Sequence, residues 1–268
     1  MGRPRSMDSL SAPLTPCSLE TIPEPVELAD GSSVWPLMLS CYELQDNGSR
    51  RGHMSLFSVP VPDIAGSNLS SMPLQFGEPY TVLDAQTSSG ILDGKWFPME
   101  TTSDADSDGK QKAWSFATAH STGEIRIHAL QVPQKTDDLP RLESDSLYSV
   151  KFLGESVRPA WDNDPSPPLC LSLSWDTTAA TTTVDKSSDL SIMVSTYSNG
   201  KVAIHDVAFD SDGQAVQIME RDSWQAHNIF TSPAEVWSAT FAHDGDRNMV
   251  LSCGDEGAVK IWDIRATR

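Results

Sequence analysis

The stretch Leu251–Arg265, LSCGDEGAVKIWDIR, decides the fold class of this 268-residue chain. Ser252 stands five residues before Gly257, and Ile261 precedes the aromatic Trp262 five residues after that glycine. A glycine between two alternating segments is typical of a tight hairpin, because the turn needs a positive φ angle that glycine adopts without strain. The alternation predicts two antiparallel strands whose Val and Ile side chains face a sheet-to-sheet core.

The same spacing recurs upstream. In Ser195–Asp206 the turn glycine is Gly200, in Thr118–Ala129 it is Gly123, and a looser hairpin spans residues 40–58. Alternating segments before and after these hairpins give about four strands per unit, which is the number in a propeller blade. No stretch holds a helical period over three turns, so the chain is predicted to be all-β.

The predicted organisation is a tail followed by four blades. Residues 1–30 are rich in Ser, Pro and acidic residues without a sustained period, which is typical of a flexible tail. Residues 31–268 are predicted to form a partial propeller. Its blades are expected near residues 31–85, 89–155, 169–221 and 224–268.

Composition narrows the classes of function. The chain has 19 Lys and Arg against 37 Asp and Glu, a net charge of −18, and no basic cluster, so no nucleic acid is expected as a partner. No apolar run is long enough for a membrane helix. The four cysteines lie far apart without a CxxC pair, which favours reduced cytoplasmic thiols and no metal site. No cofactor is expected.

The last unit resembles a WD repeat. Ala226-His227 stands where that repeat has Gly-His, and Trp262-Asp263 matches its closing dipeptide. The resemblance implies a WD-repeat β-propeller with a buried, hydrogen-bonded set that matches His227, Ser252 and Trp262. The acid before the turn glycine is Glu256 rather than the aspartate of the repeat.

A narrower resemblance appears when the units are taken in order over about residues 27–268. The chain is similar to the diphthine methyl-ester hydrolase family in Trp224-Gln-Ala-His227, in Glu235-Val-Trp237-Ser-Ala-Thr-Phe241 and in Trp262-Asp-Ile-Arg265. It departs from that family in the longer segment between His227 and Glu235, NIFTSPA. The resemblance implies about seven blades, of which about four are present. The sequence is then either a fragment or one part of a propeller that another chain completes.

The function implied by the resemblance is a step of diphthamide biosynthesis. The methyl ester of methylated diphthine on elongation factor 2 is hydrolysed, which makes that factor the expected protein partner. Other proteins are further partners through the propeller faces. Because the sequence has neither a GxSxG elbow nor an HExxH motif, neither a serine esterase nor a zinc mechanism is supported. The competing hypothesis is a non-catalytic WD-repeat scaffold, since most such propellers bind proteins.

Position within the last unit selects the candidate site residues. Glu235 and His227 are the catalytic candidates, with Glu235 as a base or a holder of a cation. Trp237 is expected to stack on the trimethylammonium group of the substrate by cation–π contact, and Asp255 to face the same mouth. The alternative interpretations are a solvated loop acid for Glu235, a core aromatic for Trp237, a turn acid for Asp255 and a structural role for His227.

Overall fold

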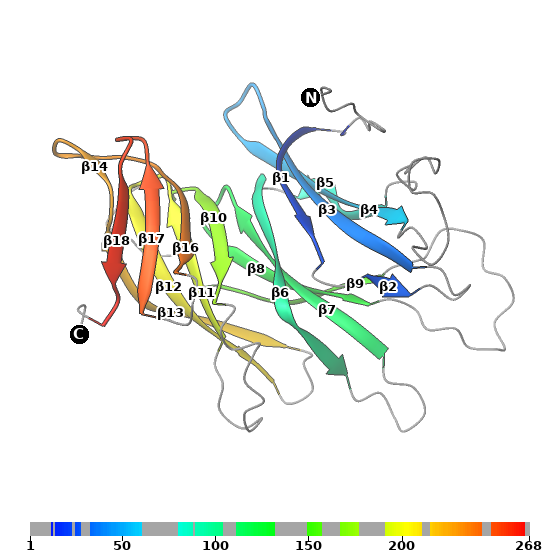
Figure 1. The fold of residues 1–268 in the computed structure, drawn as a ribbon. Coiled ribbons are helices and arrows are strands. Elements are labelled where there is room, and N and C mark those ends of the chain that lie inside the picture. The colour runs from blue at the N-terminus through cyan, green and yellow to red at the C-terminus, as the bar shows by residue number, and fades with distance from the viewer. Residues whose placement is uncertain are drawn as a thin grey trace, which may run out of the picture.

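The computed structural model describes residues 12, 14–22, 25–27, 33–60, 80–87, 89–103, 111–131, 149–156, 167–176, 191–210, 215–242 and 248–265. Every regular element in these ranges is a β-strand. The strands form four successive antiparallel sheets and one small hairpin (Figure 1). The prediction of an all-β chain is confirmed.

The first sheet has the strand order β1-β3-β4-β5, and the short β2 also pairs with β3. Its strands are β1 (Thr15–Thr21), β2 (Val26–Glu27), β3 (Ser33–Leu44), β4 (Arg50–Pro60) and β5 (Tyr80–Thr87).

Residues 1–30 were predicted to be a flexible tail, and for residues 15–21 the presence of β1 corrects that prediction. β1 pairs along β3, and Glu20 forms an ion pair with Lys95 of the second sheet at 2.9 Å. Main-chain pairing and polar contacts hold this strand, while Leu19 on it is 60% exposed. A strand fixed in this way has no periodic apolar face, which is the signal that identifies strands in a sequence.

The other sheets follow in chain order. The second, β6-β7-β8-β9, consists of β6 (Ile91–Ser103), β7 (Gln111–His120), β8 (Ile125–Gln131) and β9 (Ser149–Glu155). The third, β10-β11-β12-β13, consists of β10 (Cys170–Trp175), β11 (Ser191–Tyr197), β12 (Lys201–Phe209) and β13 (Val216–Gln225). The hairpin β14 (Asn228–Ile229) and β15 (Ser232–Pro233) precedes the fourth sheet, which is β16 (Val236–Phe241), β17 (Met249–Gly254) and β18 (Val259–Asp263).

The sheets pack face to face in series, with their first strands side by side. These innermost strands contact one another in the order β1, β6, β10, β16. A separate hydrophobic core fills each of the three spaces between successive sheets. Sheets that fan out from a shared line of inner strands are the blades of a β-propeller, as the repeats predicted.

The predicted direction of the Val and Ile side chains is confirmed where a following sheet exists. Ile127 of the second sheet and Ile204 of the third are buried between blades. Their equivalents on the fourth sheet, Val259 and Ile261, are 71% and 63% exposed. Within the described residues no sheet packs on that face, so the same pattern yields an apolar surface instead of a core.

Candidate functional site

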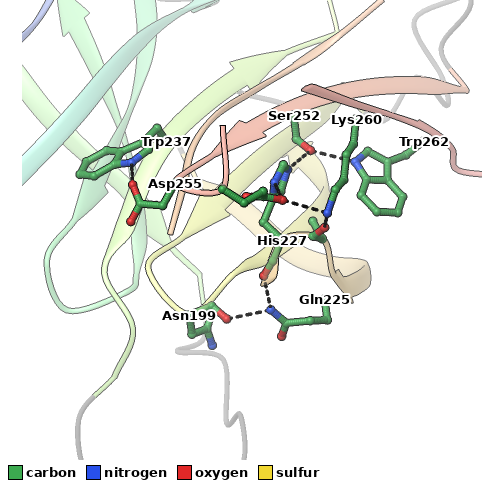
Figure 2. Close-up of polar contacts among 10 residues, drawn as sticks. Asn199, Gln225, His227, Trp237, Ser252, Asp255, Lys260 and Trp262 are labelled. Carbon is green, nitrogen blue, oxygen red and sulfur yellow. Dashed lines mark hydrogen bonds and ion pairs between the residues drawn. The ribbon is translucent and has the colours of Figure 1, made fainter. Parts of the chain in front are cut away.

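The fourth blade holds a buried polar network around His227, shown in Figure 2. The Nε2 atom of His227 lies 2.7 Å from Ser252 Oγ, and Trp262 Nε1 donates a hydrogen bond to the same oxygen at 2.8 Å. His227 Nδ1 contacts Glu256 Oε1 at 2.5 Å. The set that the WD-repeat resemblance implied is therefore present, and the longer glutamate closes it.

Lys260 stabilises the acid of this network. Its Nζ lies 2.9 Å from Glu256 Oε1 and donates to the carbonyl oxygen of Ala226 at 2.8 Å. Burial works against the charge of Glu256, but the hydrogen bonds from Lys260 and His227 outweigh it and lower the pKa of the carboxyl group. The network thereby joins the turn after β17 to the segment that precedes β16.

His227 itself is closed off from solvent. Its exposed fraction is 0%, and both ring nitrogens are engaged. Its carbonyl oxygen accepts hydrogen bonds from Ala234 N at 3.1 Å and from Gln225 Nε2 at 3.0 Å. In this conformation His227 positions the segment that leads to Glu235, and its side chain is not among those that line the recess described below.

Related groups occur in the preceding blades. In the second blade, His120 bridges Ser89 Oγ at 2.7 Å and Thr118 Oγ1 at 2.8 Å. In the third, His205 Nε2 lies 2.7 Å from Ser195 Oγ, in the place that Trp262 takes in the fourth. Burial lowers the pKa of His120 to about 3 and that of His205 to about 4, so both rings are neutral near pH 7. These histidines are structural.

A recess of about 430 Å³ opens where the four inner strands begin. All four blades contribute to its walls, although their residues are far apart in the sequence. The lining residues are Cys17, Tyr42, Arg50, Leu92, Asp93, Leu169, Leu171, Ser172, Glu235 and Trp237. The recess therefore forms only when the four blades, referred to below as the arc, are packed together.

A β-bulge at the same place in each inner strand shapes this recess. The pairing register shifts at Cys17 in β1, at Leu92 in β6, at Leu171 in β10 and at Trp237 in β16. A bulge turns one side chain away from the normal alternation of a strand. All four of these side chains line the recess, so the bulges direct one residue from each blade into a common site.

Trp237 is the largest of the four and is half exposed, at 54%. Its indole Nε1 donates a hydrogen bond to Asp255 Oδ1 at 2.5 Å, and Figure 2 shows this pair to one side of the His227 network. The backbone N–H of Asp255 donates to the carbonyl oxygen of Glu235 at 3.0 Å. An aromatic face is thus presented beside two acidic side chains, which is an arrangement suited to a cation.

Two further groups that line the recess, Cys17 and Asp93, have raised pKa values. Desolvation raises the pKa of the Cys17 thiol to about 12, with smaller contributions from Cys41 and Asp93, although the side chain reaches solvent through the recess. Burial also raises the pKa of Asp93, against the opposing influence of Lys95 and the Leu173 N–H. Cys17 is therefore a neutral thiol near pH 7, and its Sγ donates to backbone carbonyls.

The structure brings three of the four predicted site residues together. Glu235 and Trp237 line the recess, and Asp255 is bonded to Trp237. His227 lies in the neighbouring network. Sequence reasoning missed the contributions of the other blades, Cys17, Tyr42, Arg50 and Asp93 among them. One signal was available: Leu92, Leu171 and Trp237 each stand four residues before an aromatic ring.

The described residues contain no group of three or more His, Cys, Asp or Glu side chains placed to hold a metal ion. The same part of the chain contains no helix that could span a membrane.

No family model matches the chain, and no curated protein matches its sequence. Some solved structures show a partial similarity to this chain. Sqt1 from Chaetomium thermophilum is 14% identical with a TM-score of 0.45, over 93% of this chain and 43% of that one. The extracellular domains 1–2 of Drosophila Semaphorin 1a are 9% identical with a TM-score of 0.46, over 95% and 57%. The WD40 domain of SCAP from fission yeast is 10% identical with a TM-score of 0.35, over 92% and 56%. The chain spans about half the length of these structures.

Proposed function

We propose that this chain hydrolyses the methyl ester of methylated diphthine on elongation factor 2, with the recess as its active site. The observation that carries the proposal is the meeting of Glu235 and the half-exposed Trp237 in one recess, with Asp255 bonded to the indole. The substrate side chain has a trimethylammonium group and a methyl ester. The recess offers a group suited to each.

Trp237 and Asp255 supply the cation site. A quaternary ammonium over an indole face gains about 0.5–2 kcal/mol, depending on desolvation. The hydrogen bond from Trp237 Nε1 to the Asp255 carboxylate adds electron density to the ring and fixes its orientation. The net charge of −18 attracts a cationic group over a longer range.

Glu235 supplies the base. Its carboxylate accepts a proton from a water molecule, whose oxygen attacks the carbonyl carbon of the ester. The Arg50 guanidinium and the Tyr42 hydroxyl, which line the same recess, donate hydrogen bonds to the developing oxyanion. Glu235 then returns the proton to the methoxy oxygen as the C–O bond breaks. Methanol leaves, and the carboxylic acid that remains releases its proton to solvent and becomes the diphthine carboxylate.

The state of Cys17 supports water rather than a thiolate as the nucleophile. With a pKa of about 12, its thiol is almost entirely protonated near pH 7. His227 acts in the proposal as a positioning residue, because its carbonyl oxygen holds Ala234, the neighbour of Glu235.

The second candidate function is a non-catalytic scaffold. It is favoured by the exposed Val259 and Ile261 on β18, since an apolar surface on a strand at the edge of a sheet is a site for another protein. In that case the recess binds a cationic side chain and catalyses no reaction on it.

Methanol release from elongation factor 2 that carries methylated diphthine separates the two functions. The purified full-length chain is expected to release one methanol per ester, and Glu235→Gln to lower kcat about 10²- to 10⁴-fold. Glu220→Gln on β13 removes an exposed carboxylate outside the recess and is the matched control. Equal thermal unfolding of both variants excludes misfolding as the cause. No release by the unaltered chain, together with binding of the factor, would favour the scaffold.

A further inference from the structure

The hairpin β14–β15 projects from the body of the fourth blade. Its two-residue turn is Phe230-Thr231, between the pairs Asn228–Pro233 and Ile229–Ser232. All six residues are exposed, and Phe230 is 99% exposed. The loop that carries β14 extends outward at the end of the sheet where β17 and β18 are joined (Figure 1).

Phe230 stands where a turn of this kind calls for glycine. Its φ angle is +57°, the only positive value among the described non-glycine residues. A bulky side chain in this region of φ is strained, and a two-residue hairpin with positive φ at its first turn position favours glycine there. Within the described residues the ring gains no burial in return for that strain. A partner that buries the ring would supply the favourable free energy of burial that the ring lacks in the free chain.

The base of the hairpin is rigid. Ala226 and Ala234, which flank it, are buried, at 2% and 3% exposed. Gly200 O of the third blade accepts hydrogen bonds from Ala226 N at 2.8 Å and His227 N at 3.0 Å. Figure 2 shows Gln225 joined to Asn199 and to His227 at this junction. The hairpin that carries the ring is therefore fixed at its base before any partner arrives, which lowers the entropy lost on binding.

The chain leads from this hairpin directly into the recess. Glu235 follows two residues after β15, and its carbonyl oxygen holds Asp255. A partner whose side chain enters the recess lies over the same end of the blade as the hairpin. The surroundings are acidic, with Glu235 and Asp255 nearby and a net charge of −18 on the chain. The complementary surface is an apolar pocket with a rim of Lys and Arg.

We propose that Phe230 is a docking anchor that inserts into an apolar, basic-rimmed pocket on elongation factor 2. This inference rests on the proposed function, because that function supplies the partner. The hairpin then selects the whole protein substrate, while the recess selects its modified side chain.

The test compares a protein substrate with a small one. Phe230→Gly removes the ring and relieves the turn. It is expected to raise KM for methylated elongation factor 2 at least 10-fold, with kcat within 2-fold, as for a buried aromatic anchor. Hydrolysis of betaine methyl ester, which carries both reacting groups but no protein surface, is expected to stay unchanged. Phe230→Tyr, which keeps the ring, should restore KM, and Thr231→Ala is the control for the hairpin itself.

Direct binding keeps this result separate from the proposed activity. Calorimetry with the methylated factor should give a Kd at least 10-fold weaker for Phe230→Gly than for the unaltered chain, whether or not methanol is released. Binding should also weaken as salt is raised, because the rim is basic. If the unaltered chain is active and Phe230→Gly has the same KM and Kd, the proposed role of Phe230 as an anchor is wrong, while the proposed hydrolase activity stands. Failure of the unaltered chain to bind the factor also overturns the anchor.

Discussion

Three buried histidines make the stability of this fold sensitive to mild acid. Burial lowers the pKa of His120 to about 3 and of His128 and His205 to about 4, from an ordinary value of 6.5. Their exposed fractions are 0%, 4% and 2%. In the folded chain the three rings stay neutral, whereas in the unfolded chain they gain protons below pH 6.5. Their contribution to stability is thus complete above pH 6.5 and is lost as the pH falls toward 4.

The size of this effect follows from proton linkage. Between pH 7.0 and 5.5 each such histidine lowers the free energy of unfolding by about 1.2 kcal/mol, since the unfolded chain alone takes up the proton. The three together predict a loss of about 3–4 kcal/mol. Carboxyl groups of ordinary pKa contribute little in this interval, because they are ionised in both states.

Urea unfolding at the two pH values measures this loss of unfolding free energy. An equal slope of the unfolding free energy against urea concentration at both pH values checks that unfolding is two-state. Replacing His205 by Gln should remove about a third of the difference. NMR titration of the imidazole protons gives the same pKa values independently. A change in unfolding free energy below about 1 kcal/mol, or imidazole resonances that titrate near pH 6.5 in the folded chain, would refute this account of the buried rings.

Three other outcomes are expected. Ser252→Ala should lower the unfolding free energy by about 2–3 kcal/mol, because the buried His227 Nε2 and the part-buried Trp262 Nε1 lose their partner; a loss in urea unfolding under 1 kcal/mol would contradict this. Gly200→Ala should lower the unfolding free energy by about 3 kcal/mol or more, since the new Cβ would collide with Gln225 Nε2 and with backbone oxygens. Gly257→Ala has open space around the new Cβ and should lower it by only about 1 kcal/mol, through backbone strain at a positive φ angle. Equal melting temperatures for these two variants would show the comparison to be wrong. Trp237→Leu should weaken binding of betaine methyl ester roughly 3- to 30-fold in calorimetry, and an unchanged Kd would remove the indole from the cation site.

The repeats made most of the fold predictable. The spacing around Gly123, Gly200 and Gly257 located three hairpins, and all three glycines have φ between +74° and +86°. β1 was missed because its stability comes from pairing with β3 and from Glu20–Lys95, neither of which leaves a periodic pattern. The alternation of apolar and polar residues predicts strands that bury their own side chains. It does not predict a strand such as β1, which is held mainly by main-chain hydrogen bonds to its neighbour.

The site was predictable only within one blade. Glu235, Trp237 and Asp255 lie within 21 residues of one another, and a single repeat unit contains them all. Cys17 reaches the same recess from the first blade through a bulge that no local spacing specifies. Asp93 lines it from the second blade, beside the bulge at Leu92. The distance between blades is set by packing of the cores, and therefore the full recess emerges only in three dimensions.

The shared walls of the recess tie ligand binding to the folding of the whole arc. Because its residues run from Cys17 to Trp237, the recess exists only when the first and last blades are both in place. A molecule bound there stabilises the assembled arc over the unfolded chain by RT ln(1 + [L]/Kd), about 2.7 kcal/mol at a hundredfold excess over Kd. Opening of any one blade releases the molecule. The melting temperature of the chain thus becomes a direct readout of how much of the recess is occupied, for the substrate as for any other compound.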